Sequence, residues 1–378
     1  MNKLRIAYIT SEEKNNIKHW SGSSYNIYKC LKKTKNEVTW LSTSNTLIYK
    51  LLFFLEIFLS FFGINYDRSR SKSVSKFYSK KIKKLITNSN FDCIFVHQCS
   101  LVSFLNINIP IYIWTDLTYD LYQKDYLKYK NSISIKNGNL LDSLALKKAK
   151  KIFYTSVYAK KNAVKKYNIE NTKIEVIPFG SNFEYNFNKK SIYKLINARK
   201  LSKKQDIRFL SIGVDWYRKG MDDTIEVIDL LNKKGFKCSL SIVGCYPPKN
   251  KKILNFIKLH GYLNKELNSD RNKLKKLFKD SHFFILMSKA EALGVVFNEA
   301  SSFGLPSIAP NIGGISSTID NDGAILVKKN ERAETIASKI LKIFNSKNLY
   351  QKKSISSYSR YQNKNNWNII ANKLTKKL

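Results

Sequence analysis

Acidic residues are scarce in this chain. Among its 378 residues, Asp and Glu number 28 against 67 Lys and Arg, which gives a formal net charge of +39. This excess of positive charge implies an anionic partner, namely a phosphate-bearing substrate, a membrane surface or a nucleic acid. A genome with AT-rich coding bias, which raises the lysine content everywhere, is the alternative cause of part of the excess. Lysines are spread over both halves and no RRM, KH or zinc module occurs, which disfavours nucleic-acid binding.

Cysteine is also rare, and its five residues show no CxxC or Cys/His spacing of a zinc site. Their odd number and apolar surroundings favour a reducing cytoplasm. The chain starts MNKLRIAYIT, which leads directly into a strand pattern without signal-peptide architecture, so we expect a protein that is not exported. No P-loop and no GxGxxG motif occurs, and no DxD-type pair stands where a Mg²⁺-nucleotide site would need it. We therefore expect no cofactor and no required metal.

The length of the chain predicts two domains, because 378 residues exceed what one core usually fills. Two sets of alternating strand and helix patterns are separated by a polar, lysine-rich stretch without strand alternation. We therefore expect two doubly wound α/β domains. The expected N-terminal domain covers residues 1–182, the linker 183–205 and the C-terminal domain 206–361.

One stretch, residues 281–315, organises the second half. An apolar run of strand length leads into a polar loop, a short helix pattern and a second strand, so the loop lies at the carboxyl end of a parallel strand. Glu291 precedes the helix and Glu299 falls in its second turn. Free N–H groups at the helix start, which Gly294 opens, favour an anion such as a diphosphate. From spacing alone, an ordinary βαβ unit with two solvated glutamates is the alternative.

This stretch resembles the E-x7-E donor-site signature of family 4 glycosyltransferases, which are retaining enzymes of GT-B fold. The resemblance rests on the run from Glu291 to Glu299, followed by Gly304-Leu305-Pro306 and Gly313-Gly314. It implies two facing Rossmann-like domains with a cleft between them, the first binding the acceptor and the second the nucleotide-sugar donor. A C-terminal helix, about residues 362–378, would pack back on the first domain. Glu291 would lie by the transferred sugar, Glu299 would bind the ribose, and the donor-binding residues between them would be Ala292, Leu293, Gly294, Val295 and Val296.

A second strand-turn-helix pattern, residues 207–231, carries the basic residues Arg218 and Lys219 in its turn. Both can clamp phosphate oxygens, and an arginine can do so with two hydrogen bonds. A solvated basic turn is the alternative. The resemblance places an Arg and a Lys on the donor diphosphate here, which implicates Arg218 and Lys219. It also implicates further donor-binding residues at strand ends and in the loop after the first strand: Gly22, Ser23, Gly213, Gly244 and Tyr262.

Two polar residues in the first half, His97 and Asp116, follow short apolar strands. Both are expected at the carboxyl ends of strands, on the side where Gly22 also lies, and we take them as catalytic candidates together with Glu291, Arg218 and Lys219. A structural histidine is the alternative for His97. Many members of the family carry a histidine where this chain has Thr115-Asp116-Leu117-Thr118, and the segment resembles a subgroup with Ser/Thr-Asp-x-Thr.

Residues 47–64 form an apolar stretch close to membrane-span length. Lys50 and Glu56 interrupt it, and each charge near a bilayer centre costs about 2.5 to 3.5 kcal/mol, so a spanning helix is disfavoured. Many basic residues follow between positions 67 and 84, where Asp67 is the one acid. An apolar helix beside a basic one can bind an anionic membrane surface. Packing of this helix on the N-terminal sheet is the alternative.

These observations favour a metal-independent, retaining glycosyltransferase that moves a sugar from a nucleotide-sugar donor to a hydroxyl of a glycan or lipid-linked acceptor. We expect it to act in the cytoplasm, peripherally on the inner face of the plasma membrane, in the synthesis of a cell-surface glycan or glycolipid. A GT-B enzyme that acts on the nucleotide sugar or on a glycan itself, such as an epimerase or a phosphorylase, is the alternative. The base, sugar, acceptor and linkage do not follow from the residues.

Overall fold

The chain folds into two compact units. Unit 1 comprises Met1–Phe179 and Ile370–Leu378, and unit 2 comprises Gly180–Ile369. The computed structural model describes residues 3–14, 19–43, 47–64, 66–127, 132–183, 187–199, 201 and 206–378. Within these ranges the five cysteines are all buried and free.

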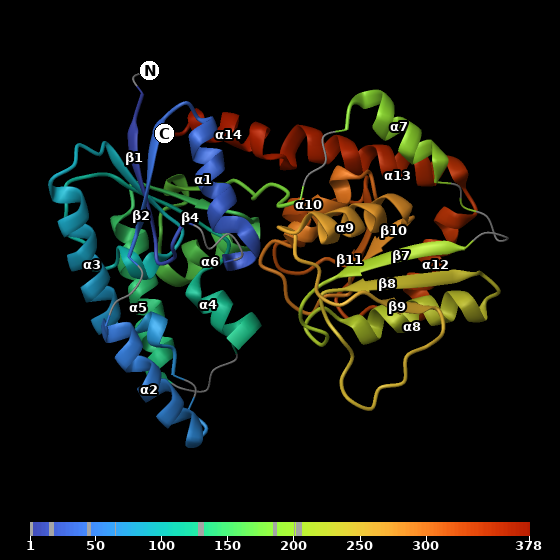
Figure 1. The fold of residues 1–378 in the computed structure, drawn as a ribbon, viewed down its shortest axis with the longest axis horizontal. Helices are drawn as coiled ribbons and strands as arrows, with labels where there is room; N and C mark the ends of the chain where they lie inside the picture. Colours follow the sequence, from blue (N-terminus) through green and yellow to red (C-terminus); the bar gives the residue numbers. More distant parts are fainter. Residues whose placement is uncertain are drawn as a thin grey trace. The chain divides into compact units, whose positions relative to one another are not determined.

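Unit 1 is built on a six-stranded parallel sheet of order β2-β1-β3-β4-β5-β6 (Figure 1). The central strands are continuously apolar and buried, as a parallel sheet covered by helices requires. In register, Ile6 pairs with Cys93 and Ile94 pairs with Ile111. The strands are β1 (Arg5–Thr10), β2 (Glu37–Ser42), β3 (Cys93–Val96), β4 (Ile111–Thr115), β5 (Lys151–Tyr154) and β6 (Ile174–Val176).

The helices of unit 1 mostly bury one apolar stripe. For example, α1 buries Ile27 and Leu31, and α3 buries Val74, Tyr78 and Ile82, which are spaced by about one helical turn. The helices are α1 (Ser23–Lys33), α2 (Leu47–Phe61), α3 (Lys72–Thr87), α4 (Tyr119–Tyr122), α5 (Ser132–Lys148) and α6 (Val157–Tyr167).

Unit 2 contains a second six-stranded parallel sheet, of order β12-β11-β10-β7-β8-β9. Its strands are β7 (Ile207–Ile212), β8 (Cys238–Val243), β9 (Ile257–Leu259), β10 (Phe283–Ile285), β11 (Ser307–Pro310) and β12 (Ala324–Val327). Its helices are α7 (Lys189–Ala198), α8 (Met221–Lys233), α9 (Asn268–Asp280), α10 (Val295–Ser302), α11 (Ile315–Thr318), α12 (Ala333–Phe344) and α13 (Lys347–Arg360). The last helix, α14 (Trp367–Thr375), returns the chain to unit 1. The expected pair of doubly wound, Rossmann-like domains is confirmed.

In both sheets the strand order reverses beside the first strand of the unit. From β1 the chain builds β2 on one side and then crosses to β3 on the other, and from β7 it builds β8 and β9 before crossing to β10. The loops that leave such a pair of strands run to opposite sides, which opens a crevice at their carboxyl ends. The crevices therefore lie after β1 and β3 in unit 1, and after β7 and β10 in unit 2.

Part of the segment expected to be a linker, residues 183–205, is helix α7. Its Ile192 and Ile196 are buried against Tyr358 and Tyr361 of unit 2, so a polar composition concealed a packed amphipathic helix. Residues 184–186, 200 and 202–205 of this expected linker lie outside the described residues. The pattern also gave no indication of α9 and α13, which carry few apolar residues among many lysines and serines.

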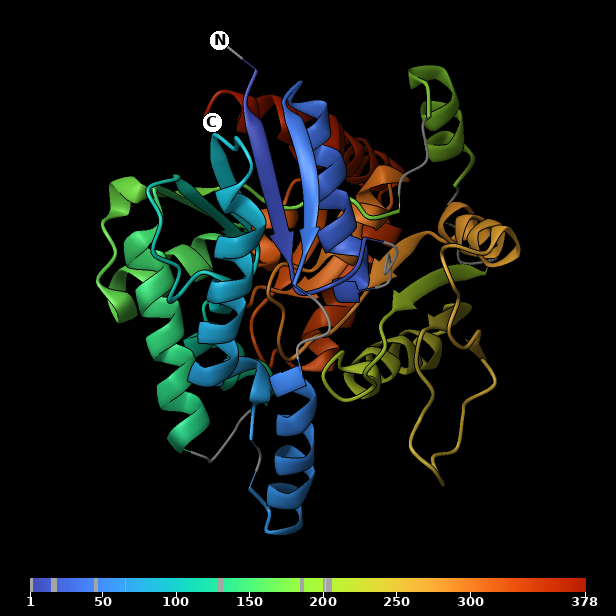
Figure 2. The same ribbon diagram turned by 60° about the vertical axis from the view of Figure 1, so that its left-hand side comes forward.

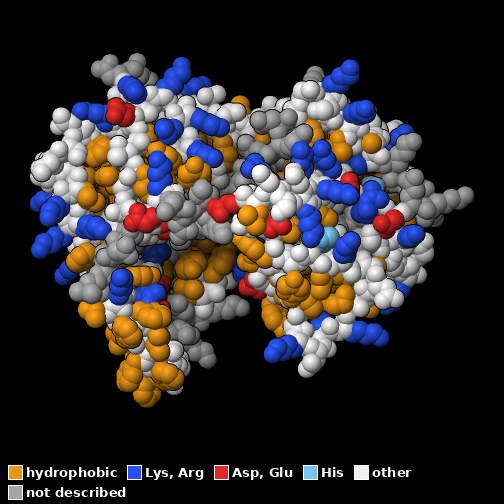
Figure 3. Space-filling view, viewed as in Figure 1, with side chains coloured by type: hydrophobic (Ala, Val, Ile, Leu, Met, Phe, Trp, Pro, Cys, Tyr) orange, Lys and Arg blue, Asp and Glu red, His pale blue; other side chains and the backbone are white. Residues whose placement is uncertain are grey.

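Helix α2 does not pack on the sheet of unit 1 along its length. It projects from the unit (Figures 1 and 2), and its apolar side chains form a bare protrusion in the space-filling view (Figure 3). Phe61 is 82% exposed and Phe54 is 68% exposed. No described helix is both long enough and apolar enough to cross a membrane.

Arg199 ties the end of the α7 segment into unit 2. The buried guanidinium donates to the carbonyls of Phe303 and Gly304 after α10, at 3.0 and 3.1 Å, and to that of Phe278 in α9, at 3.0 Å. A cation at the carboxyl ends of two helices is favourable because the helix dipoles point their negative ends at it.

We predict that Arg199→Met lowers the free energy of unfolding by about 3 kcal/mol, because it leaves buried carbonyl groups without donors. Urea denaturation followed by circular dichroism measures the loss. The matched control is Lys194→Met on the exposed side of α7, which should change stability little. Equal shifts for the two variants would show that the guanidinium contributes nothing specific.

Candidate functional site

Two charged residues meet at the crevice of unit 2. The Nζ of Lys219, in the loop after β7, lies 2.5 Å from Oε1 of Glu291, in the loop after β10. The hydroxyl of Ser288 donates to the same carboxylate oxygen at 2.7 Å. The strand order brings these loops together although 72 positions separate the two charged residues.

Glycines set the path of the loop that carries Lys219. Gly220 has φ of 61°, and a Cβ there would collide with the carbonyl oxygen of Met287. Gly213 lies under the Lys219 side chain, whose Cγ would be 2.5 Å from an added Cβ. Glycine at these positions therefore lets the lysine stem lie flat on the strand end and reach Glu291.

The N-terminus of α10 opens beside this pair. Gly294 is the N-cap with φ of 79°, and its position leaves the first-turn amides without a capping side chain. Val295 and Val296 are partly exposed, whereas Ala292 and Leu293 before them are buried. Because helix N-termini carry partial positive charge, this end of α10 is suited to an anionic group.

Glu299 lies in the second turn of α10 and is 2% exposed. Its Oε1 lies 2.5 Å from Nζ of Lys265, and Glu291, with its lysine, is 5% exposed. The alternative of two solvated glutamates is therefore wrong. A buried carboxylate needs a partner of this kind, since an isolated one would lose several kcal/mol of hydration.

The remaining donor-site candidates of unit 2 lie at the same edge of its sheet. The Arg218 guanidinium lies 3.5 Å from the carboxylate of Asp215 and donates to the carbonyl of Ala290 at 3.4 Å. Gly244 follows β8 and packs its backbone on the carbonyl of Gly213. Tyr262, after β9, is 61% exposed. The structure thus places these residues on one edge, with Lys219 and Glu291 at its centre.

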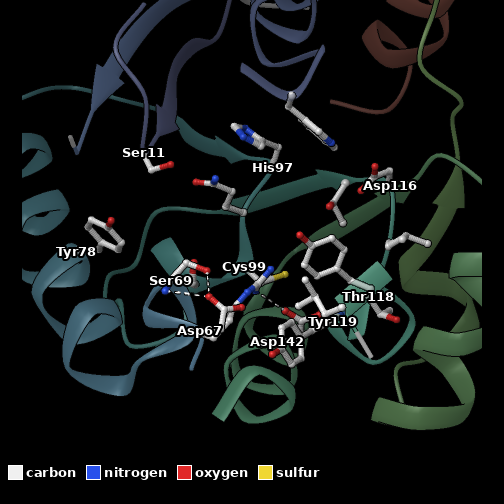
Figure 4. A pocket seen from close by; sticks show the side chains of 18 of the residues that line it. Ser11, Asp67, Ser69, Tyr78, His97, Cys99, Asp116, Thr118, Tyr119 and Asp142 are labelled. Atoms are coloured by element: carbon white, nitrogen blue, oxygen red, sulfur yellow. Dashed lines mark hydrogen bonds and ion pairs between the residues drawn. The ribbon is translucent and has the colours of Figure 1, made fainter. Parts of the chain in front are cut away.

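Unit 1 contains a cavity of about 630 Å³ at its own crevice. Ser11 and Glu12 after β1, His97 and Gln98 after β3, and Asp116 after β4 line it. Figure 4 shows Ser11, His97 and Asp116 around the hollow, with Asp67, Ser69 and Tyr119 on its other side. Gly22 and Ser23 do not line the cavity. They lie beside it, as the contact between the next residue, Ser24, and the lining residue His97 shows.

His97 is held by contacts on both ring nitrogens. Nδ1 lies 3.1 Å from the Tyr8 hydroxyl, and Nε2 lies 3.3 Å from the Ser24 hydroxyl and 3.7 Å from the Glu12 carboxylate. The indole of Trp20 stacks on the ring at a centroid distance of 5.0 Å. These contacts fix the orientation of the imidazole at the cavity wall.

Burial raises the pKa of Asp116 to about 6, although hydrogen bonds from its own amide, from Trp20 and from the Leu117 amide oppose the shift. Deeper in the cavity wall, Arg70 pairs with Asp142 at 3.3 Å, and burial raises the pKa of that carboxyl. Sequence reasoning missed Glu12, Gln98, Arg70 and Asp142. The first two stand directly after strand ends, which is the signal that identified His97, whereas nothing local marked the other two.

No group of three or more His, Cys, Asp or Glu side chains is placed to hold a metal ion within the described ranges.

Comparisons with known proteins identify the domain to which the Lys219–Glu291 pair belongs. Residues 194–360 match the family described as "Glycosyl transferases group 1". Unit 2 contains a glycosyltransferase group 1 domain. A curated glycogen synthase of Pseudomonas putida is 26% identical over 106 residues, and this match covers 28% of the chain and 20% of the length of the synthase.

Solved structures are similar to the whole chain. A glycosyltransferase from Rickettsia africae has a TM-score of 0.65 at 20% identity and covers 100% of this chain and 98% of its own. The Anabaena protein HepE in complex with UDP-glucose has a TM-score of 0.62 at 13% identity, with 99% of each chain covered. These similarities confirm the expected GT-B fold.

We predict that Asp116→Asn stabilises the protein at neutral pH. A folded-state pKa near 6, above the ordinary 3.8, means that ionisation on going from pH 4 to pH 6 favours the unfolded chain. Two pKa units correspond to about 2.7 kcal/mol, which solvent at the half-buried carboxyl reduces to about 1 to 2 kcal/mol. The gain should be full above pH 6 and vanish below pH 4.

Thermal melting from pH 3.5 to 8 measures this difference between Asp116→Asn and the unaltered protein. Asp92→Asn in the same unit is the control, because hydrogen bonds from Arg5 hold the pKa of Asp92 below its ordinary range, so this variant should give no gain at neutral pH. A gain of Asp116→Asn that is constant over the whole pH range would contradict the raised pKa.

Proposed function

We propose that the protein is a retaining, metal-independent glycosyltransferase that moves a sugar from a nucleotide-sugar donor to an acceptor hydroxyl. The observation that carries the proposal is the Lys219–Glu291 pair beside the open N-terminus of α10, within a segment that matches the group 1 family. The run from Glu291 to Glu299 resembles the E-x7-E signature, and we assign these residues to the donor site on that basis.

The proposed donor is a nucleoside diphosphate sugar. A bound UDP-glucose in the similar HepE structure is consistent with this class of ligand. The diphosphate would bind at the N-terminus of α10, to Arg218 and to Lys219. The ribose would hydrogen-bond to Glu299. Gly244 and Tyr262 would lie towards the base, and Gly22 and Ser23 would contribute from the loop after β1.

Charge develops on the leaving diphosphate as the glycosidic bond breaks. Two cationic side chains and a helix N-terminus can stabilise it in a partly buried site, without an added ion. We therefore propose a reaction that needs neither metal nor cofactor. Product with retained configuration would arise by front-face attack, with a donor phosphate oxygen assisting deprotonation of the acceptor hydroxyl.

We further propose that Glu291 positions the sugar and does not form a covalent intermediate. One of its oxygens already accepts from Lys219 and from Ser288, which lowers its nucleophilicity. His97 and Asp116 belong to the cavity of unit 1, and we assign them to the acceptor side.

The proposed place of action is the cytoplasmic face of a membrane, in the synthesis of a cell-surface glycan or glycolipid. The bare apolar face of α2 and the basic α3 support attachment to an anionic membrane surface. The base, the sugar and the linkage are open, and thermal shifts with UDP-, GDP-, ADP- and CMP-sugars would identify the donor.

We predict that Lys219→Ala lowers kcat/KM by about 10²-fold or more, the scale of losing one electrostatic donor in a water-poor site. Glu291→Gln should impair transfer but leave the binding of free nucleoside diphosphate nearly unchanged. The control is Lys289→Ala, since this exposed neighbour lies 3.8 Å from Asp223 and outside the proposed contacts. Melting curves of all variants separate lost folding from lost chemistry.

The same assay, run in EDTA with NMR of the product anomer, tests the mechanism. Activity that survives chelation and a retained anomeric centre are expected. Loss of activity in EDTA, or inversion, would falsify the metal-free retaining reaction. A changed nucleotide sugar formed without any acceptor would favour the epimerase alternative, and a sugar 1-phosphate released from a glycan by inorganic phosphate would favour the phosphorylase.

We also predict that Glu299→Ala raises the donor KM more than it lowers kcat, because a ribose contact acts alike in ground and transition states. Steady-state kinetics with varied donor measures both constants. A large fall in kcat at unchanged KM would mean that Glu299, and not Glu291, acts at the reacting sugar.

A further inference from the structure

We propose that the cavity of unit 1 binds the saccharide headgroup of a membrane lipid, and that residues 51–64 enter the bilayer to bring the cavity to it. This inference rests on the proposed glycosyltransferase function and names the class of its acceptor. We call residues 51–64 the apolar arm. The arm covers most of α2 and the turn that follows it.

The apolar arm and the cavity share their boundaries. Tyr49 and Lys50, in the first turn of α2, line the cavity directly before the arm begins. Asp67, Ser69 and Arg70 line it directly after the arm ends. The chain therefore leaves the cavity wall, runs out along the arm and returns to the same wall. Insertion of the arm into a bilayer would thus bring the cavity next to the lipid headgroups.

The arm is apolar on nearly all sides and lacks a covering element within the described residues. A helix that is hydrophobic all round is normally buried in protein or in lipid. Its large side chains are instead exposed: Leu51, Phe53, Phe54, Leu55, Ile57, Phe58, Phe61, Phe62 and Ile64.

Arg68 fixes the base of the arm to the unit. Its guanidinium lies 3.3 Å from the carboxylate of Glu56 and stacks 4.4 Å from the ring centre of Tyr49 and 4.6 Å from that of Phe53. Because Arg68 follows the arm and contacts three positions along α2, these interactions give the arm a defined direction. The exposed apolar surface is thus held outward by specific interactions.

The basic residues near the arm favour an anionic bilayer as the surface that covers it. Helix α3 follows the arm and exposes Lys72, Lys76, Lys80, Lys83 and Lys84. Each basic residue near an anionic surface adds favourable electrostatic free energy, which salt attenuates. Arms of two copies could also cover each other, but this would bring together two chains of formal charge +39. Mutual repulsion disfavours that pairing.

The cavity itself suits a neutral saccharide. Its volume of about 630 Å³ lies within the range of small-molecule sites. Carboxylates of Glu12, Asp67 and Asp116 accept hydrogen bonds from hydroxyls, and the rings of Trp20 and Tyr122 offer flat faces. Four carboxylates line the cavity, those of Glu12, Asp67, Asp116 and Asp142, against the two cations of Lys50 and Arg70, and this balance opposes binding of an anion.

One cavity residue has an unused acceptor. Nε2 of Gln98 donates to Glu12 at 3.0 Å, while the buried Oε1 of Gln98 accepts no hydrogen bond from any described residue. A buried carbonyl oxygen without a donor costs about 1 to 3 kcal/mol. A sugar hydroxyl in the cavity would supply that donor.

Radiolabelled transfer tests the acceptor class. The full-length protein is incubated with the labelled nucleotide sugar that binds in the thermal-shift screen and with membranes of the cells that make the protein. We expect the label in the lipid extracted by organic solvent. Label found only in water-soluble glycan or protein, or no transfer although the donor binds, would overturn the proposal. Failure of every nucleotide sugar to bind would instead overturn the proposed function.

The arm is tested separately by flotation with vesicles of phosphatidylglycerol and phosphatidylcholine in equal parts. The double variant Phe58→Ser, Phe61→Ser should weaken vesicle binding by about a hundredfold or more and reduce lipid labelling in parallel. Val157→Ser, an exposed apolar residue of α6, is the control. Vesicle binding or lipid labelling that the arm variant leaves unchanged would show that the arm does not serve a membrane acceptor, and a dimer dissociated by this variant would assign the arm to a second copy.

The cavity is tested with Gln98→Leu, which has a similar size but no carbonyl acceptor. We expect the half-saturating concentration of extracted lipid to rise about tenfold, with donor KM unchanged. An unchanged half-saturating concentration in a folded variant would place the acceptor outside this cavity.

Discussion

The reversal of strand order beside the first strand of each sheet is the constraint on which both candidate sites depend. Adjacent strands normally send their loops the same way over the sheet, whereas β1 and β3, like β7 and β10, send them apart. The backbone is thereby withdrawn from the carboxyl ends of these strands, and side chains line the gap. The cavity of unit 1 and the Lys219–Glu291 pair of unit 2 both occupy this position.

Glu291 and Glu299 show how such a crevice stabilises buried carboxylates in the absence of a ligand. Each is almost fully buried and each has one lysine at 2.5 Å, so neither carboxylate faces low-dielectric surroundings alone. A diphosphate that approaches Lys219 would share a cation already engaged with Glu291. Binding of the donor would therefore rearrange an existing ion pair, because the anionic diphosphate would compete with the Glu291 carboxylate for the Lys219 ammonium.

Sequence patterns could predict those parts of the structure that local chemistry determines. Continuous apolar runs located the strands, Gly294 located the start of α10, and polar residues after strands located His97 and Asp116. The order of the strands was not predictable, because parallel neighbours pair across long crossovers. Helix α7 was missed because Ile192 and Ile196 provide only two buried contacts in a lysine-rich stretch. Arg70 and Asp142 escaped notice because their pairing depends on tertiary distance and on no local motif.

The apolar arm raises the question of how a stable fold keeps such surface in water. Burial of one large apolar side chain contributes about 1.5 to 3 kcal/mol, and a whole domain is stable by only about 5 to 15 kcal/mol. The exposed side chains of the arm, between Leu51 and Ile64, thus forgo a burial free energy comparable with the stability of a typical domain. The core of unit 1 is complete without them, since its strands are covered by other helices. Burial of these side chains can consequently stabilise association with another surface. The adjacent lysines of α3 favour an anionic one.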